Sequence, residues 1–455
     1  MADRKRAKAR ARHAARNNSF AVPEPALPPV DRAGSWLTWI IAISAMIIPL
    51  ILSASGEDTF RYPKELALRF ETILLIVVLV LLWAFKRLRL QFDIRQKWMA
   101  VTAAICCWTV FTALLSTNRL VSIPPTVRVL EYALVLTVTV LVLRHRPLWI
   151  AGVIVPSAIV NAIIYILQEF DVWSPFATTE AIEKHITRTA LIGNPNDVGS
   201  YLIVPALIAV VLALVSPRGR IAWAAAATVL IAGTFVTQTV AAIAGLFVAL
   251  LVLLVLWLRS PVKAFAVIML TLVAAVTVTM TYAPLRQRLT TMREALAKRD
   301  YEALSAARLV PFFAAAEMAR DHPLVGVGPG CFSYNFFDYK LRVQIRHREL
   351  FGRGVTTYNF GEVHNDHLQV ASETGLPGYV LFLASLVILA AGSFRSGRSG
   401  NGPGDHLRGE FVRLLSLPLA ISLFVLALAQ FPLELVAPTH AYLWAAGIVM
   451  SWRQP

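Results

Sequence analysis

The run TVAAIAGLFVALLVLLVLWL (residues 239–258) contains twenty residues and no charged side chain. A helix rises about 1.5 Å per residue, so such a run crosses the roughly 30 Å hydrocarbon layer of a bilayer. Similar runs recur along the 455 residues, of which 57% are hydrophobic and 15% charged, with a mean hydropathy of +0.62. A soluble domain carries about 25% charged residues. The composition therefore predicts an all-α, polytopic membrane protein.

We expect about twelve membrane-spanning helices and one large, partly helical hydrophilic loop, residues 284–365. A basic tail (1–35) precedes the first span, nine spans fill residues 36–283, and three fill residues 366–455. No cleavable signal is apparent, so we expect the first span to be retained. The expected spans are 36–55, 66–85, 98–115, 127–143, 148–168, 196–215, 221–237, 239–258, 263–283, 366–392, 412–430 and 438–452.

Lysine and arginine in the connecting segments predict the orientation. With the N-terminus inside, the inner segments carry 24 of these residues and the short outer loops carry 5. Short basic loops stay in the cytoplasm, whereas a long loop such as 284–365 crosses regardless of charge. Both termini are therefore expected inside and the long loop outside. The net charge of +16 then faces membrane lipid head groups, and we expect no nucleic-acid partner.

The segment VHNDHLQVASETGLPG (363–378) gathers polar groups at the start of an apolar helix. His364 suits general-base chemistry because an imidazole titrates near neutrality. The residues alone also allow a helix N-terminus capped by Asn365 or Asp366. His364 and His367 at i and i+3 suggest a metal site, but zinc helices use i, i+4 and a third ligand at defined spacing. We expect no metal.

Arg188 and Arg308 are candidate anion-binding residues, because a guanidinium grips phosphate oxygens through two parallel N–H groups. Taken alone, each is more simply a solvated loop charge. Arg308 falls in a predicted helix over 300–320, or directly before one that starts near Pro311. Asn194 opens a turn that predicts the N-cap of the sixth span.

Two other functional classes fit the residues less well. The run GVGPG (326–330) predicts a glycine-rich turn, but it follows no strand and lacks the Lys-Ser/Thr ending of a phosphate-binding loop. Transport pathways usually carry ionisable groups at mid-membrane. Here Glu71, Arg128 and Glu131 are expected near span ends, with Arg128 and Glu131 paired at i and i+3.

Together, these segments resemble the O-antigen ligase and O-antigen polymerase superfamily of bacterial membrane glycosyltransferases. The resemblance covers about residues 185–450. It rests on an Arg-led loop helix and on the segments GNPND (193–197), DHPLVGVGPGCF (321–332), HNDHLQVASETGLPG (364–378) and FPLE (431–434).

The resemblance implies transfer of a glycan from an undecaprenyl-diphosphate carrier to an acceptor hydroxyl, at the periplasmic face of the bacterial inner membrane. It implies no metal, ATP or other cofactor. The family histidine corresponds to His364, which would activate the acceptor, and the diphosphate-binding arginines to Arg188 and Arg308. We also expect Asn194, Asn365 and Glu373 to bind substrate.

Family members often carry a Thr-x-Ser-Arg-like element after the seventh span. This chain has Thr237-Gln238-Thr239-Val240 there, so another cation must act if the diphosphate is held in the same way. Three functional alternatives remain: a ligase that attaches glycan to a lipid, glycan or protein acceptor, a polymerase that extends the repeat on its carrier, and a transporter.

Overall fold

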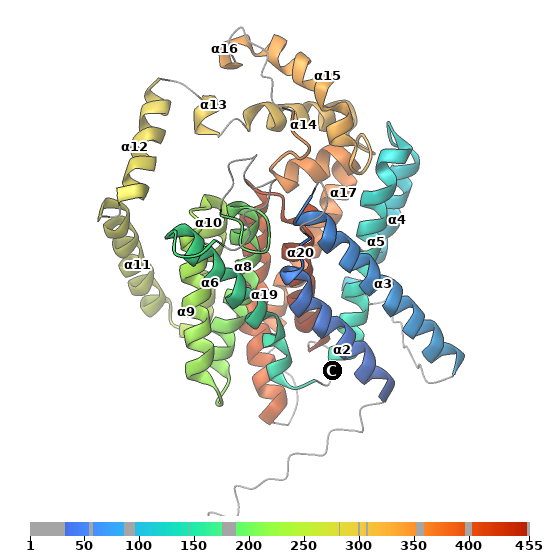
Figure 1. The fold of residues 1–455 in the computed structure, drawn as a ribbon, viewed down its shortest axis with the longest axis vertical. Coiled ribbons are helices and arrows are strands. Elements are labelled where there is room, and N and C mark those ends of the chain that lie inside the picture. Colours follow the sequence, from blue (N-terminus) through green and yellow to red (C-terminus); the bar gives the residue numbers. More distant parts are fainter. Residues whose placement is uncertain are drawn as a thin grey trace, which may run out of the picture.

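The computed structural model describes residues 32–53, 58–85, 96–144, 146–174, 188–281, 283–298, 301–305, 308–351, 359–395 and 403–452. These residues form helices and no strands, so the predicted all-α class is confirmed. Figure 1 shows a bundle of long helices with a group of shorter helices over one end. The basic tail falls outside the described residues as far as residue 31.

Each predicted span coincides with a helix. Eight described helices are long and apolar enough to cross a membrane, and two shorter apolar helices cover 35–50 and 220–236. The expected number of about twelve is not established. The helices are α2 (Arg32–Ile47) with η1 (Ile48–Leu50), α3 (Arg61–Ala84), α4 (Lys97–Leu114), α5 (Arg119–Leu143), η2 (Leu148–Ile154) with α6 (Val155–Glu169), α8 (Pro195–Val215), α9 (Arg220–Val236), α10 (Val240–Leu258), α11 (Pro261–Thr281), α17 (Asp366–Ala390) with α18 (Gly392–Arg395), α19 (Pro403–Ala427) and α20 (Val436–Ser451).

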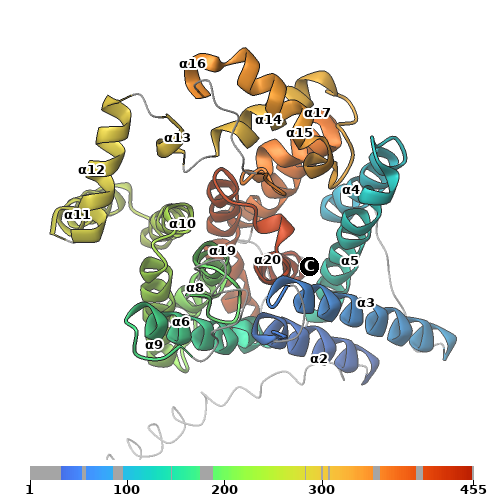
Figure 2. The same cartoon turned by 45° about the horizontal axis from the view of Figure 1, so that its top comes forward.

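Helix α8 lies at the centre of the bundle. It is apolar on nearly every side and almost all of its residues are buried, as expected for a helix surrounded by other helices. It packs against α6, α9, α10, α19 and α20, and both ribbon views place it among them (Figures 1 and 2). Its first turn is thereby held in the interior of the protein.

Two predictions about intramembrane charges were wrong. Glu71 lies near the middle of α3, where its Oε2 is 2.9 Å from Nε2 of His440 on α20. Arg128 does not pair with Glu131; it donates hydrogen bonds to Glu434 and to Glu65. In an apolar interior, charged groups satisfy one another across helices, and a single sequence reveals only neighbours on the same helix.

The described residues of the long loop form five helices: α12 (Ala283–Ala297), α13 (Tyr301–Leu304), α14 (Leu309–Asp321), α15 (Cys331–Arg346) and α16 (Arg348–Phe351). Helix α14 begins directly after Arg308 and carries Pro311 in its first turn, where a missing N–H costs nothing. Of the two alternatives for this segment, the helix that starts near Pro311 is therefore right.

The glycine-rich turn fastens the loop to α17. The N–H groups of Val327 and Gly328 each donate to backbone oxygens of α17, at Ser372 and Glu373, over 2.9 Å. Gly326 has a φ of +68°, and a Cβ there would lie 2.3 Å from the carbonyl carbon of Glu373. Only glycine fits so close an approach in this conformation. The predicted turn is confirmed, and it positions α14 and α15 above the first turns of α17.

Candidate functional site

His364 lies at the end of the bundle that α14 and α15 cover, one residue before the N-cap of α17. Its φ of +59° belongs to the left-handed region, which non-glycine residues seldom adopt and which often marks functional positions. Its ring meets that of Phe431 edge-on, with centroids 4.6 Å apart. Nδ1 is buried without a hydrogen-bond partner among the described residues. The contact with Phe431 thus holds the ring in place, while Nδ1 makes no hydrogen bond to the described residues.

Two arginines act on this imidazole. Burial lowers the pKa of His364 to about 4, helped by the positive charges of Arg308 and Arg61. Arg308 donates from Nη1 to the carbonyl oxygen of Ala429 at 2.9 Å, two residues before Phe431. His364 is therefore neutral at physiological pH, with a lone pair available on one nitrogen.

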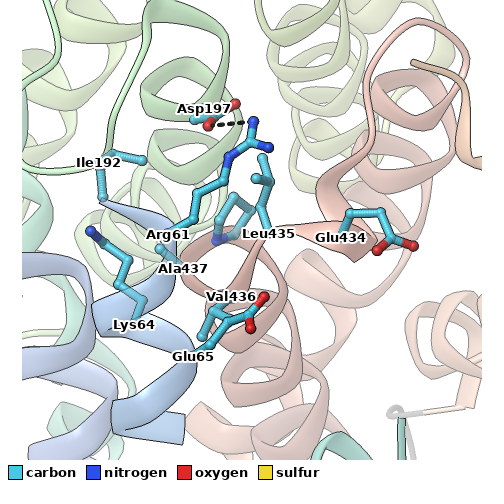
Figure 3. A pocket seen from close by; sticks show the side chains of 10 residues that line it. Arg61, Lys64, Glu65, Ile192, Asp197, Glu434, Leu435, Val436 and Ala437 are labelled. Carbon is cyan, nitrogen blue, oxygen red and sulfur yellow. Dashed lines mark hydrogen bonds and ion pairs between the residues drawn. The ribbon is translucent and has the colours of Figure 1, made fainter. Parts of the chain in front are cut away.

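Arg61, at the start of α3, is a site residue that sequence reasoning missed. Its guanidinium carbon lies 5.3 Å from the centre of the Phe431 ring. The guanidinium donates to Asp197 at 3.3 Å and to Glu362 at 3.2 Å, and Figure 3 shows it directed toward Asp197. No local sequence pattern predicts the contact between Arg61 and Glu362, because the two residues are 301 positions apart.

Arg188 lies in different surroundings from the ones expected. Its Nε is 3.2 Å from Oε2 of Glu169, without the alignment of a hydrogen bond. Gln238, in the segment that lacks the family arginine, donates to the other oxygen of Glu169 at 3.2 Å. Arg188 is not among the charges that shift the pKa of His364. The structure therefore brings Arg308 to His364 and leaves Arg188 beside Glu169.

Asn194 and Asn365 act as helix N-caps, a role that the sequence predicted for Asn194 and allowed for either Asn365 or Asp366. The Asn194 side chain accepts the N–H of Asp197 at 3.0 Å and starts α8. Asn365 accepts the N–H of Leu368 at 3.0 Å and donates to the carbonyl of Leu428 at 2.8 Å. Through these bonds both residues fix the starts of helices that border the site.

Glu373 and His367 also have structural partners. Glu373 accepts the N–H groups of Gly330 and Phe332, so its carboxylate holds the first turn of α15, where the helix dipole favours negative charge. The two ring nitrogens of His367 lie 3.0 Å from the carbonyl oxygen of Phe424 and 3.3 Å from the hydroxyl of Tyr379. The unpartnered nitrogen thus distinguishes His364 from His367.

A cavity of about 310 Å³ lies between α4, α5, α17, α19 and α20. Its walls are mainly apolar, and its polar groups include Arg128, Asp366, Gln369, Glu373 and Glu434. Glu434 also lines the small pocket around Arg61 and Asp197, so the cavity and that pocket share a wall residue. Among the described residues, no three His, Cys, Asp or Glu side chains gather as metal ligands.

Comparison with known families gives one match. Residues 225–383 match the family model described as O-Antigen ligase. The resemblance to the O-antigen ligase and polymerase superfamily is thereby confirmed, over a shorter stretch than the 185–450 expected. No curated protein matches the chain.

The O-antigen ligase match contains both Arg308 and His364, and it supports a multi-pass membrane enzyme of ligase or polymerase type. Such an enzyme acts in general on a lipid-linked glycan donor and an acceptor. Arg61 and Phe431 lie outside the matched residues. The site in three dimensions is therefore wider than the region that carries the similarity.

Proposed function

We propose that this protein transfers a glycan from an undecaprenyl-diphosphate carrier to an acceptor hydroxyl, with His364 as the general base and arginines holding the diphosphate. The observation that carries the proposal is the unpartnered, buried Nδ1 of His364 beside Arg308. A base needs a nitrogen that no hydrogen bond already occupies, and a diphosphate leaving group needs fixed positive charge nearby.

In the proposed reaction, the acceptor oxygen attacks the anomeric carbon of the donor sugar. A carbon–oxygen bond forms to the acceptor while the bond to the diphosphate oxygen breaks. The acceptor proton passes to His364, and the electron pair leaves with the undecaprenyl diphosphate. Arg308 stabilises the charge that develops on the leaving group. The diphosphate supplies the driving force, so the scheme includes no ATP, metal or other cofactor.

Substrate binding should make His364 a stronger base. Burial and the nearby positive charges of Arg308 and Arg61 lower the pKa of His364 to about 4. A bound diphosphate would neutralise those charges, which raises the pKa toward the range where imidazoles accept protons best. The base would then gain strength only when the donor is present.

The predicted sidedness places this chemistry at the periplasmic face of a bacterial inner membrane. The start of α3, the start of α8, residues 359–365 and residues 428–435 meet at one end of the bundle through the bonds of Arg61 and Asn365. These segments belong to loops assigned to the same side by the distribution of 24 basic residues against 5. A cysteine at Ser333, exposed on α15, should react with an impermeant maleimide in cells with a permeabilised outer membrane and an intact inner one.

We propose that the cavity holds the apolar chain of a lipid-linked acceptor. The carboxyl groups of Asp366 and Glu434 in its wall can form hydrogen bonds with hydroxyl or amino groups, and the cation in its wall, Arg128, is already paired with Glu434 and Glu65. An acceptor with a hydroxylated head therefore fits better than a second diphosphate. This arrangement favours a ligase with a lipid acceptor over a polymerase, whose acceptor is itself diphosphate-linked.

The test replaces His364 with Asn, which tolerates the left-handed backbone but cannot act as the base. We expect normal membrane abundance and a loss of transfer of about 10²-fold or more. The glycan of the deletion strain then separates the alternatives: ligase loss strands full-length chains on the carrier, and polymerase loss leaves single repeats on the acceptor. Full transfer by His364→Asn would exclude the proposed base.

A further inference from the structure

We propose that Arg61 is the second arginine that binds the donor diphosphate, and that Glu362 occupies its anion position until the donor arrives. This inference deepens the proposed function and rests on it. It identifies a cation for the place where Val240 stands instead of arginine, and it gives Glu362 the role of a resident substitute for the phosphate.

Arg61 and Arg308 reach the same imidazole from distant parts of the chain. The ring of Phe431 is 4.6 Å from the His364 ring and 5.3 Å from the Arg61 guanidinium carbon. Arg308 binds the carbonyl of Ala429, two residues earlier. Both positive charges act on His364. A diphosphate beside the base would therefore have one guanidinium from α3 and one from the loop.

Residues 237–240, where family members often have an arginine, contact the first turn of α8, and so does Arg61. The Thr239 hydroxyl donates to the carbonyl of Pro195 at 3.0 Å, in the first turn of α8. Arg61 pairs with Asp197 in that same turn. The positive charge of Arg61 on α3 therefore lies close to the residues that directly precede Val240.

The two carboxylates on Arg61 differ in burial, and this difference suggests different tasks. The Asp197 side chain is 2% exposed, so its contact with Arg61 is fixed inside the protein. The Glu362 side chain is 30% exposed and that of Arg61 37%. Ion pairs open to water contribute little and exchange readily. Asp197 therefore orients the guanidinium, while Glu362 is the carboxylate that an incoming phosphate can replace.

The other nearby cations are committed elsewhere. The ammonium group of Lys64 donates to three carbonyl oxygens, at 2.8 Å from Ile51, 2.9 Å from Phe60 and 2.7 Å from Leu191. An ammonium has three donors, so Lys64 has none left for a phosphate. Arg188 lies beside Glu169. Arg61 lies near His364, and one of its two partners, Glu362, is both anionic and exchangeable.

The experiment titrates inorganic pyrophosphate into the purified full-length protein in detergent and follows the rise in thermal unfolding temperature. Glu362→Gln removes the resident anion, so we expect tighter binding, by about tenfold, the scale of one charged hydrogen bond. Arg61→Gln should weaken binding by a similar factor, as should Arg308→Gln. The matched controls are Glu317→Gln and Arg342→Gln, which break other ion pairs of the loop and should bind as the wild type does.

A gain of affinity in Glu362→Gln cannot come from misfolding. Because Arg61→Gln leaves Asp197 buried and unpaired, the double variant Arg61→Gln/Asp197→Asn serves as its folded counterpart. Glu362→Gln that binds no more tightly than wild type, or Arg61 variants with wild-type affinity, would overturn the inference. The proposed function fails separately, if His364→Asn transfers glycan normally. If Arg308→Gln alone weakens pyrophosphate binding, the function stands and Arg61 has no part in it.

Discussion

Arg308 donates a hydrogen bond from Nη1 to the carbonyl oxygen of Ala429, at 2.9 Å. This bond holds the guanidinium where its positive charge helps to lower the pKa of His364. Arg308→Lys keeps the charge but has a single nitrogen, which cannot bind Ala429 and a diphosphate with the same geometry. We expect donor affinity to fall by about tenfold, measured by titration with an undecaprenyl-diphosphate analogue. Arg342→Lys, on the exposed face of α15, is the control. Equal affinity in Arg308→Lys would remove Arg308 from the donor site.

The pH dependence of kcat/KM should carry the shifted titration of His364. The pKa of about 4, against an ordinary value near 6.5, leaves the base neutral at pH 5.5, where an ordinary histidine is roughly nine-tenths protonated. The value of kcat/KM at pH 5.5 should therefore be close to its value at pH 7. Arg308→Gln removes one cause of the shift, so its acid limb should move to higher pH. An acid limb near 6.5 in the wild type would contradict this assignment.

The lowered pKa of His364 also predicts that the free energy of unfolding decreases as the pH falls. Between pH 4 and 6.5 the unfolded chain binds a proton at His364 and the folded protein does not. The stability that this group contributes is therefore complete above 6.5 and is lost as the pH falls toward 4. Thermal unfolding of His364→Asn should show a weaker decline over this window than the wild type. Parallel declines would mean that other groups dominate acid destabilisation.

Glu373 should prove more important for stability than for catalysis. Its carboxylate accepts the N–H groups of Gly330 and Phe332, and each buried N–H left unpaired costs about 1–3 kcal/mol. Glu373→Ala should lower the unfolding temperature and loosen α15, detected as faster proteolysis between α14 and α15. Glu317→Ala, which breaks the contact with Arg346, is the comparison. Unchanged stability with lost transfer would instead point to substrate binding.

Gly326 should tolerate no side chain. A Cβ there would lie 2.3 Å from the Glu373 carbonyl carbon, at a φ of +68°. Gly326→Ala must therefore move the loop away from α17, so we expect low membrane abundance and little transfer. Gly361→Ala is a close control because nothing lies within 4 Å of its added Cβ. Its abundance should equal that of the wild type. A well-folded, active Gly326→Ala protein would show that the turn need not touch α17.

Local patterns predicted the local part of this structure. The apolar runs gave the helices, and Asn194 and Asn365 cap the helices that follow them because capping involves residues three apart. Contacts between residues far apart in the chain could not be predicted from a single sequence. Arg128 meets Glu434 306 residues away, and nothing near Arg61 indicates Glu362. The sequence therefore named His364 and Arg308 as candidates, which the structure brings close together, and did not name Arg61, which lies beside them.

The chain from Leu428 to Phe431 holds both the base and one cation. Asn365 is bonded to Leu428, Arg308 to Ala429, and the His364 ring rests on Phe431. Arg61 also lies against Phe431, but its ion pair with Asp197 fastens it to α8. A shift of residues 428–431 would therefore move His364 and Arg308 together, while Arg61 keeps its partner on α8. The distance between the guanidinium groups of Arg61 and Arg308 can thus change, and this distance sets the length of the anion that both arginines can bind at once.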